Sequence, residues 1–195
     1  MYLESLSLIQ FKNYQDASLA FCPRLNFLTG PNGSGKTNLM DAIYYLAFCK
    51  SFFNPVDSQN ILSDKDFFFI QGLFAYGHGQ YKVSCAVKRN QKKVFKLDDN
   101  EYERFSDHIG LIPLVFISPN DTVLIQGGSE EKRKLIDSVI SQCDHQFLEA
   151  LMVYNRNLAQ RNALLKSFAE KNFFDGSLLE VYDDQLIASG ELIFE

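Results

Sequence analysis

Several features that define other classes of protein are absent from this sequence. None of its 195 residues is tryptophan, and no apolar run reaches the length of about 18 residues that a membrane-spanning helix needs. The first residues, Met1-Tyr2-Leu3-Glu4, lack the basic and then apolar pattern of a secretory signal, so we expect none. The cysteines, at positions 22, 49, 85 and 143, form no Cys-x-x-Cys pair. We therefore expect no disulfide framework, no structural metal and a reducing, cytoplasmic location.

An excess of basic residues is also absent. The chain carries 19 Lys and Arg against 24 Asp and Glu, a net charge of -5. This balance excludes a uniformly basic surface for nucleic acid but allows a local basic site. With 46% hydrophobic and 22% charged residues, the chain can bury a core, and its 18 phenylalanines predict that aromatic rings fill much of it.

The hydrophobic pattern predicts strands first and helices later. In chain order, we expect strands within residues 1–29, the last at 25–28; a helix at 39–47; strands within 67–97 with turns at 77–79 and 90–91; a short strand at 114–117; and helices from 129 onward, including 147–165 and 181–195. The apolar stripe of the first late helix is Leu135, Ile136, Val139 and Ile140. We therefore expect an α/β subdomain at 1–125 and a helical one at 126–195. The last helix stops in mid-pattern, which suggests a piece of a longer chain.

The phosphate-binding motif G-x-x-x-x-G-K-[ST] is matched in full by Gly30, Pro31, Asn32, Gly33, Ser34, Gly35, Lys36 and Thr37. An expected strand precedes the motif and an expected helix follows it, as a phosphate loop requires. Glycines let backbone N–H groups approach phosphate oxygens, and the start of a helix favours the same anion. Lys36 would bind the β- and γ-phosphates, and the Thr37 hydroxyl would ligate Mg²⁺. We predict a nucleoside triphosphate site rather than a glycine-rich turn that happens to precede a lysine.

Hydrolysis also needs an acidic residue on a second strand, and the sequence offers no clear one. The next acid after the apolar run 114–117 is Asp121, beyond Pro119. The acids within 178–184 lie in a helical neighbourhood, and residues 126–129 lack the Leu-Ser expected before two glycines in a nucleotide-sensing signature. The sequence thus predicts nucleotide binding without efficient hydrolysis, and it identifies no catalytic residue.

Several runs of residues resemble the RecF proteins, bacterial recombination mediators of the SMC and ABC-type ATPase group. They are residues 1–6 with 11–14, 30–46, 50–52, 116–121, 127–137 and 154–166, of which the last is the most specific. The resemblance covers nearly the whole chain.

This resemblance implies an ABC-ATPase-like α/β head, a mixed sheet around a phosphate loop and helix, followed by a helical subdomain. It implies an ATP-dependent homodimer that binds ATP with Mg²⁺ and associates with single-stranded or gapped DNA during recombinational repair and replication-fork restart. Its expected partner is RecR, with RecO in the same pathway. The signature motif and the acidic strand of the family would lie beyond position 195. By resemblance, Lys12, Asn13 and Asn38 contact the nucleotide, and Asn120 stands near the place of a glutamine that contacts Mg²⁺.

The segment 82–96, called the basic window below, is strongly basic, whereas the rest of the chain is acidic. It contains no acid and six basic residues: Lys82, Lys88, Arg89, Lys92, Lys93 and Lys96. Such a cluster suits contact with the DNA phosphate backbone, although lysines also protect a solvated edge hairpin from aggregation. A weaker candidate is the polar face carrying Arg156, Arg161 and Lys166, which an ordinary solvated face explains as well. The histidines His78, His108 and His145 stand apart, so we expect them at surface or turn positions.

Two other functions fit a phosphate loop. One is a P-loop phosphotransferase acting on a small molecule, which would need an acceptor site and an arginine-bearing lid. No arginine cluster in the sequence resembles such a lid. The other is a non-catalytic interaction module that binds nucleotide structurally.

Overall fold

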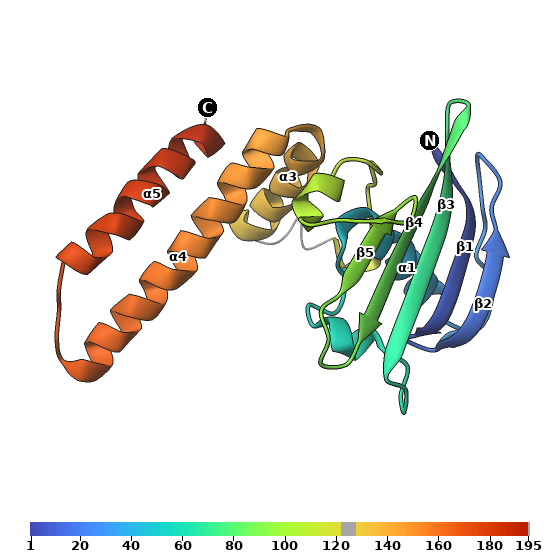
Figure 1. The fold of residues 1–195 in the computed structure, drawn as a ribbon, viewed down its shortest axis with the longest axis horizontal. Coiled ribbons are helices and arrows are strands. Elements are labelled where there is room, and N and C mark those ends of the chain that lie inside the picture. Colours follow the sequence, from blue (N-terminus) through green and yellow to red (C-terminus); the bar gives the residue numbers. More distant parts are fainter. Residues whose placement is uncertain (122–127, 195) are drawn as a thin grey trace. The chain divides into compact units, whose positions relative to one another are not determined.

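The computed structural model describes residues 1–121 and 128–194 of the chain, and Asn120 only in its backbone (Figure 1). The chain divides into two compact units, Met1–Phe116 and Ile117–Glu195. The boundary expected between residues 125 and 126 lies outside the described residues and stays a prediction.

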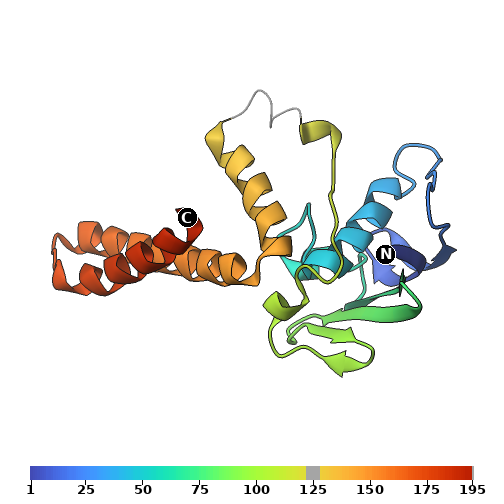
Figure 2. The same ribbon diagram turned by 90° about the horizontal axis from the view of Figure 1, so that it is seen from above.

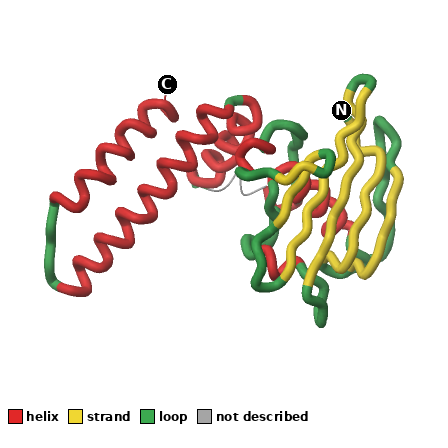
Figure 3. Tube along the Cα trace, viewed as in Figure 1, coloured by secondary structure: helices red, strands yellow, loops and turns green. Residues whose placement is uncertain are grey.

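The first unit is built on an antiparallel sheet of six strands in the order β2-β1-β3-β4-β5-β6 (Figure 3). The strands are β1 (Tyr2–Phe11), β2 (Tyr14–Ala20), β3 (Phe67–Tyr76), β4 (Gly79–Lys88), β5 (Val94–Leu97) and β6 (Asn100–Glu101). The turns expected at 77–79 and 90–91 are confirmed, with Gly77 and Asn90 in the left-handed region at φ of 57° and 58°. Hairpins therefore connect β3 to β4 and β4 to β5, as the alternating pattern predicts.

Helix α1 (Lys36–Phe48) lies against one face of this sheet (Figure 2). Alternate strand residues face it and are fully buried, among them Leu6, Leu8, Phe68, Ile70, Val83 and Phe95. Phe11, Tyr45 and Phe68 meet edge to face at centroid distances of 5.2 to 6.3 Å. Aromatic rings therefore fill the centre of the core, as the phenylalanine content predicts.

Two expected strands are wrong. Residues 25–28 and 114–117 have no regular secondary structure and join no strand in the part of the chain that the structure describes. Leu25 and Phe27 are 67% and 78% exposed, and Val115 and Ile117 are 71% and 74% exposed. A strand is defined by hydrogen bonds to a neighbour, so an apolar run without one stays irregular.

The second unit contains three helices: α3 (Ser129–Cys143), α4 (His145–Lys171) and α5 (Ser177–Phe194). These helices confirm the expected ones up to residue 194. Asp144 caps α4, because its Oδ1 accepts hydrogen bonds from the backbone N–H groups of Gln146 and Phe147. Helix α5 runs back along α4, and the Arg161 Nε lies 2.5 Å from the Asp183 Oδ1. Leu135, Ile136 and Val139 of the expected stripe on α3 are exposed rather than buried.

The expected surface position of His108 is wrong. His108 lies in η2 (Phe105–His108) with no exposed surface. Its Nε2 lies 2.7 Å from the carbonyl oxygen of Leu46, in the last turn of α1. The sequence gives no sign of this burial because Leu46 is distant in the chain.

Within the described ranges, no helix combines the length and apolarity needed to cross a membrane. The described His, Cys, Asp and Glu side chains form no group of three that could hold a metal ion. All four cysteines are free, and burial raises the pKa of the Cys49 thiol to about 12.

A candidate nucleotide-binding site at the start of helix α1

The loop of residues 30–35 leads directly into α1. Gly33 and Gly35 have φ of 81° and 102°, a region that residues with a side chain rarely adopt. Gly35 is the N-cap of α1, and no described side chain caps this helix end. The first helical hydrogen bond runs from the Leu39 N–H to the Gly35 carbonyl. The preceding N–H groups of the first turn are therefore free of a side-chain acceptor, as an anion-binding helix start requires.

Lys36 lies over the loop. Its Nζ is 2.7 Å from the carbonyl oxygens of both Gly30 and Pro31. Thr37 is exposed to solvent one residue later. The ammonium group and the hydroxyl that the motif assigns to phosphate and Mg²⁺ are thus both at the start of α1.

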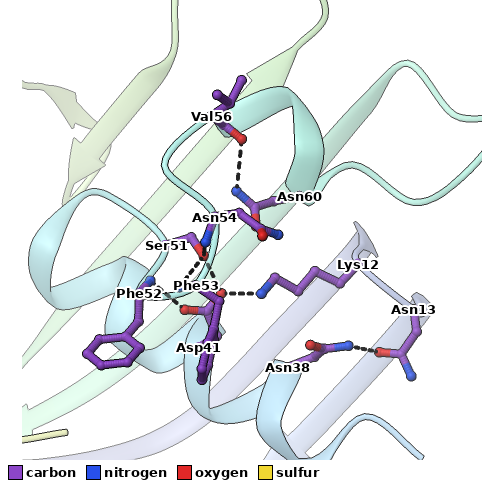
Figure 4. Close-up of polar contacts among 10 residues, drawn as sticks. All are labelled: Lys12, Asn13, Asn38, Asp41, Ser51, Phe52, Phe53, Asn54, Val56 and Asn60. Atoms are coloured by element: carbon purple, nitrogen blue, oxygen red, sulfur yellow. Dashed lines mark hydrogen bonds and ion pairs between the residues drawn. The ribbon is translucent and has the colours of Figure 1, made fainter. Parts of the chain in front are cut away.

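The turn between β1 and β2 packs against this loop. The Tyr14 hydroxyl donates a hydrogen bond to the Gly35 carbonyl at 3.1 Å. A Cβ at position 35 would come within 2.7 Å of the Asn13 side chain, and residues with a side chain rarely adopt the φ of 102° found there, so both features favour glycine. The Asn38 Nδ2 donates to the Asn13 Oδ1 at 2.8 Å, which links the turn to α1 (Figure 4). The structure therefore brings Asn13 and Asn38 beside the loop.

Lys12, in the same turn, was expected to contact the nucleotide, but its ammonium is paired with an acidic residue. Its Nζ lies 2.6 Å from the Asp41 Oδ2, and the two side chains are 9% and 0% exposed (Figure 4). Sequence reasoning missed Asp41 and Tyr14 as parts of the site. The signal for Asp41 was present, because it is the one acidic residue in positions 36–48 of the sequence.

Asn120 belongs to η3 (Pro119–Asp121), and its side chain lies outside the part of the chain that the structure describes. Its expected role as a Mg²⁺ ligand stays a prediction.

The basic window lies on β4, β5 and the turn between them. Lys88, Arg89 and Lys92 are exposed at the turn around Asn90. Lys82 and Lys96 alternate with buried residues of β4 and β5, so they lie on the sheet face opposite α1. The Lys82 Nζ lies 2.5 Å from the Asp99 Oδ2.

Lys93 does not belong to this basic surface. Its Nζ lies 2.7 Å from the Cys49 carbonyl oxygen and 2.9 Å from the Asp57 Oδ2, and its side chain is only 14% exposed. The ammonium also stands 5.3 Å from the Tyr45 ring centroid and 5.1 Å from that of Phe105. We therefore remove Lys93 from the expected DNA-binding residues, because its charge is neutralised within the first unit. Its acidic partner is too distant in the chain for the sequence to indicate the pairing.

Comparison with known proteins places this loop in a family. Residues 2–122 match the family described as RecF/RecN/SMC N terminal domain. The chain belongs to this family. It is 50% identical over 196 residues to the DNA replication and repair protein RecF of Phocaeicola vulgatus, which it matches over 100% of its own length and 52% of the relative's. The resemblance to RecF proteins is thereby confirmed.

Solved structures of RecF share the fold. A structure described as the recombination mediator protein RecF-ATPrS in the RecFOR pathway has a TM-score of 0.91 and 31% identity, covering 99% of this chain and 52% of that one. The corresponding RecF-ATP structure has a TM-score of 0.88, 31% identity and the same coverage. The expected head fold with its helical part is confirmed, but the six described strands pair only antiparallel, where a mixed sheet was expected. The chain spans about half the length of the RecF proteins it matches.

Proposed function

We propose that the chain is the nucleotide-binding part of an ATP-dependent DNA-binding protein that acts in recombinational repair and replication-fork restart. The observation that carries this proposal is the loop at residues 30–37, where an uncapped helix start and the Lys36 ammonium surround a glycine cradle. The RecF relatives, described as DNA replication and repair proteins and solved with ATP, support it.

Different groups of the site would bind different parts of Mg²⁺-ATP. Backbone N–H groups at the start of α1 would bind phosphate oxygens, and Lys36 would exchange the carbonyls of Gly30 and Pro31 for the β- and γ-phosphates. The Thr37 hydroxyl would hold Mg²⁺, which supplies charge neutralisation when bound. Asn13 and Asn38 border the same cradle.

The DNA-binding surface in this proposal is the exposed part of the basic window. Lys88, Arg89 and Lys92 would contact phosphates at the β4–β5 turn, with Lys82 and Lys96 on the adjoining sheet face. Contacts of this kind are independent of sequence and weaken as salt rises. In the cytoplasm, two copies would enclose the nucleotide, with RecR as the partner protein and RecO in the same pathway.

Lys36→Ala tests the nucleotide site. We expect the variant to keep its circular dichroism spectrum and to bind ATP about 10- to 100-fold more weakly, because a charge-assisted contact to the phosphates is lost. Isothermal titration calorimetry with Mg²⁺-ATP measures the change. Lys50→Ala is the matched control, since Lys50 is an exposed lysine in the same unit. Equal ATP affinity in wild type and Lys36→Ala would reject the site.

A further inference from the structure

Asp41 is a completely buried carboxylate one helical turn beyond Thr37. It accepts three polar contacts: the Lys12 Nζ at 2.6 Å, the Ser51 Oγ at 2.7 Å and the Phe52 backbone N–H at 2.7 Å (Figure 4). A buried charge of this kind is tolerated only when it is paired and hydrogen-bonded. Removing Lys12, Ser51 or the Phe52 N–H as a partner would therefore also disturb the other two contacts of Asp41.

The turn between β1 and β2 is attached to α1 at two successive positions. Asn38 and Asp41 are three residues apart, so they lie on the same face of α1. Asn38 bonds Asn13, and Asp41 pairs with the preceding residue, Lys12. The residue after the turn, Tyr14 at the start of β2, donates a hydrogen bond from its hydroxyl to the Gly35 carbonyl. The position of the turn against the phosphate loop thus depends on both attachments.

Lys12 is also fixed at its backbone. It has a φ of 51°, and its N–H donates to the Asn60 carbonyl at 2.8 Å. The loop that provides this carbonyl returns to Asp41, because Asn54 bonds both the Asn60 side chain and the Ser51 hydroxyl. These contacts form a closed ring from Asp41 through Lys12, Asn60, Asn54 and Ser51 back to Asp41.

We propose that Asp41 is a positioning residue of the nucleotide site, and that it acts by holding Lys12 so that Asn13 and Tyr14 stay packed against Gly35. This inference rests on the proposed function of the loop. It assigns the Lys12 ammonium to Asp41 rather than to the nucleotide, so the ion pair as a whole shapes the cradle.

A double-variant cycle on ATP affinity tests the proposal. Asp41→Asn leaves the Lys12 ammonium buried without its ion-pair partner. Lys12→Met leaves the Asp41 carboxylate buried without its ion-pair partner. We expect each single variant to bind Mg²⁺-ATP about 5- to 30-fold more weakly than wild type. The double variant removes one charge of each sign and keeps the net charge of the chain. We expect it to bind about as weakly as either single variant and no more weakly, because all three variants lose the same ion pair.

The controls separate positioning from stability and from the function itself. Val87→Ala opens a cavity beside β4 and so lowers stability without removing the ion pair. Its ATP affinity is compared with that of wild type and of the Asp41 and Lys12 variants, at a temperature where calorimetry shows every variant folded. Should Asp41→Asn fail to fold, Lys12→Gln replaces it, because Gln keeps an N–H donor for the carboxylate but loses the charge. We expect this variant to bind ATP more weakly than wild type.

Each outcome decides the question. Wild-type affinity in the folded single variants, or an equal loss in Val87→Ala, would reject a positioning role. A double variant whose loss equals the product of the two single fold-losses would also reject it, since Lys12 and Asp41 would then act on the nucleotide independently. Failure of wild type to bind ATP, or equal binding by Lys36→Ala, would instead reject the proposed function on which the inference rests.

Discussion

His108 has no exposed surface, and its two ring nitrogens have different partners. The Leu46 carbonyl can only accept, so Nε2 carries the proton and donates at 2.7 Å. Nδ1 of the neutral ring then accepts from the Tyr102 hydroxyl at 3.2 Å. Burial lowers the pKa of His108 below its ordinary value of 6.5. The neutral imidazole therefore satisfies a carbonyl at the end of α1 that has no helical partner.

This burial predicts a loss of stability in mild acid. The unfolded chain takes up a proton on His108 near pH 6.5 while the folded chain resists it, so the free energy of unfolding falls as pH drops below that value. The slope from one such group is at most about 1.4 kcal/mol per pH unit. Urea unfolding at pH 7.5, 6.5 and 5.5 should show a smaller decline in His108→Gln than in wild type. His78→Gln, at an exposed turn, should keep the wild-type decline. The same decline in His108→Gln would show that another group causes it.

The sequence correctly predicts the helices and strands whose pattern lies within a short stretch of the chain. The hairpins of β3, β4 and β5 follow from alternation and turn residues, and α1, α4 and α5 follow from helical periodicity. Residues 25–28 and 114–117 have the composition of strands, but composition does not provide a hydrogen-bonded neighbour.

The same limit applies to the candidate site. The phosphate-loop motif is contiguous in the sequence, whereas the pairs Lys12–Asp41 and Lys93–Asp57 join elements distant in the chain. Such ion pairs depend on how the sheet and α1 pack, so the residues alone could not assign Lys93 to the interior.

The β4–β5 turn carries a prediction about DNA. We expect replacement of Lys88, Arg89 and Lys92 by Gln to weaken DNA binding and to lower the slope of log affinity against log salt by about 2 to 3, since each phosphate contact releases a counterion. Fluorescence anisotropy with single-stranded and gapped DNA at several salt concentrations measures this slope. The control replaces Lys132, Lys134 and Lys171, three exposed lysines of the helical unit that lie outside both candidate DNA-binding surfaces. An unchanged slope in the turn variant, or an equal loss in the control, would place the DNA elsewhere.

At the scale of the whole molecule, the parts of the proposed ATP site are concentrated in one unit. Asn13, the loop 30–35, Lys36 and Asn38 all belong to Met1–Phe116. The acidic residue that hydrolysis requires has no comparable candidate, because the apolar run 114–117 forms no strand among the described residues. The RecF relatives are about twice as long as this chain. We propose that their remaining length provides the acidic strand and the signature motif that act on a nucleotide held here.

The 195-residue chain should therefore bind ATP but turn it over poorly. Binding needs only the cradle at the start of α1, whereas phosphoryl transfer to water also needs a group that orients the attacking water and holds Mg²⁺. Phosphate release measured at saturating Mg²⁺-ATP should match that of Lys36→Ala, which gives the background of the preparation. Adding single-stranded or gapped DNA should leave the rate unchanged in this chain. If wild type released phosphate well above the Lys36→Ala background, the hydrolytic group would lie within these residues, and the acids at positions 121 and 180 to 184 would be the first to replace.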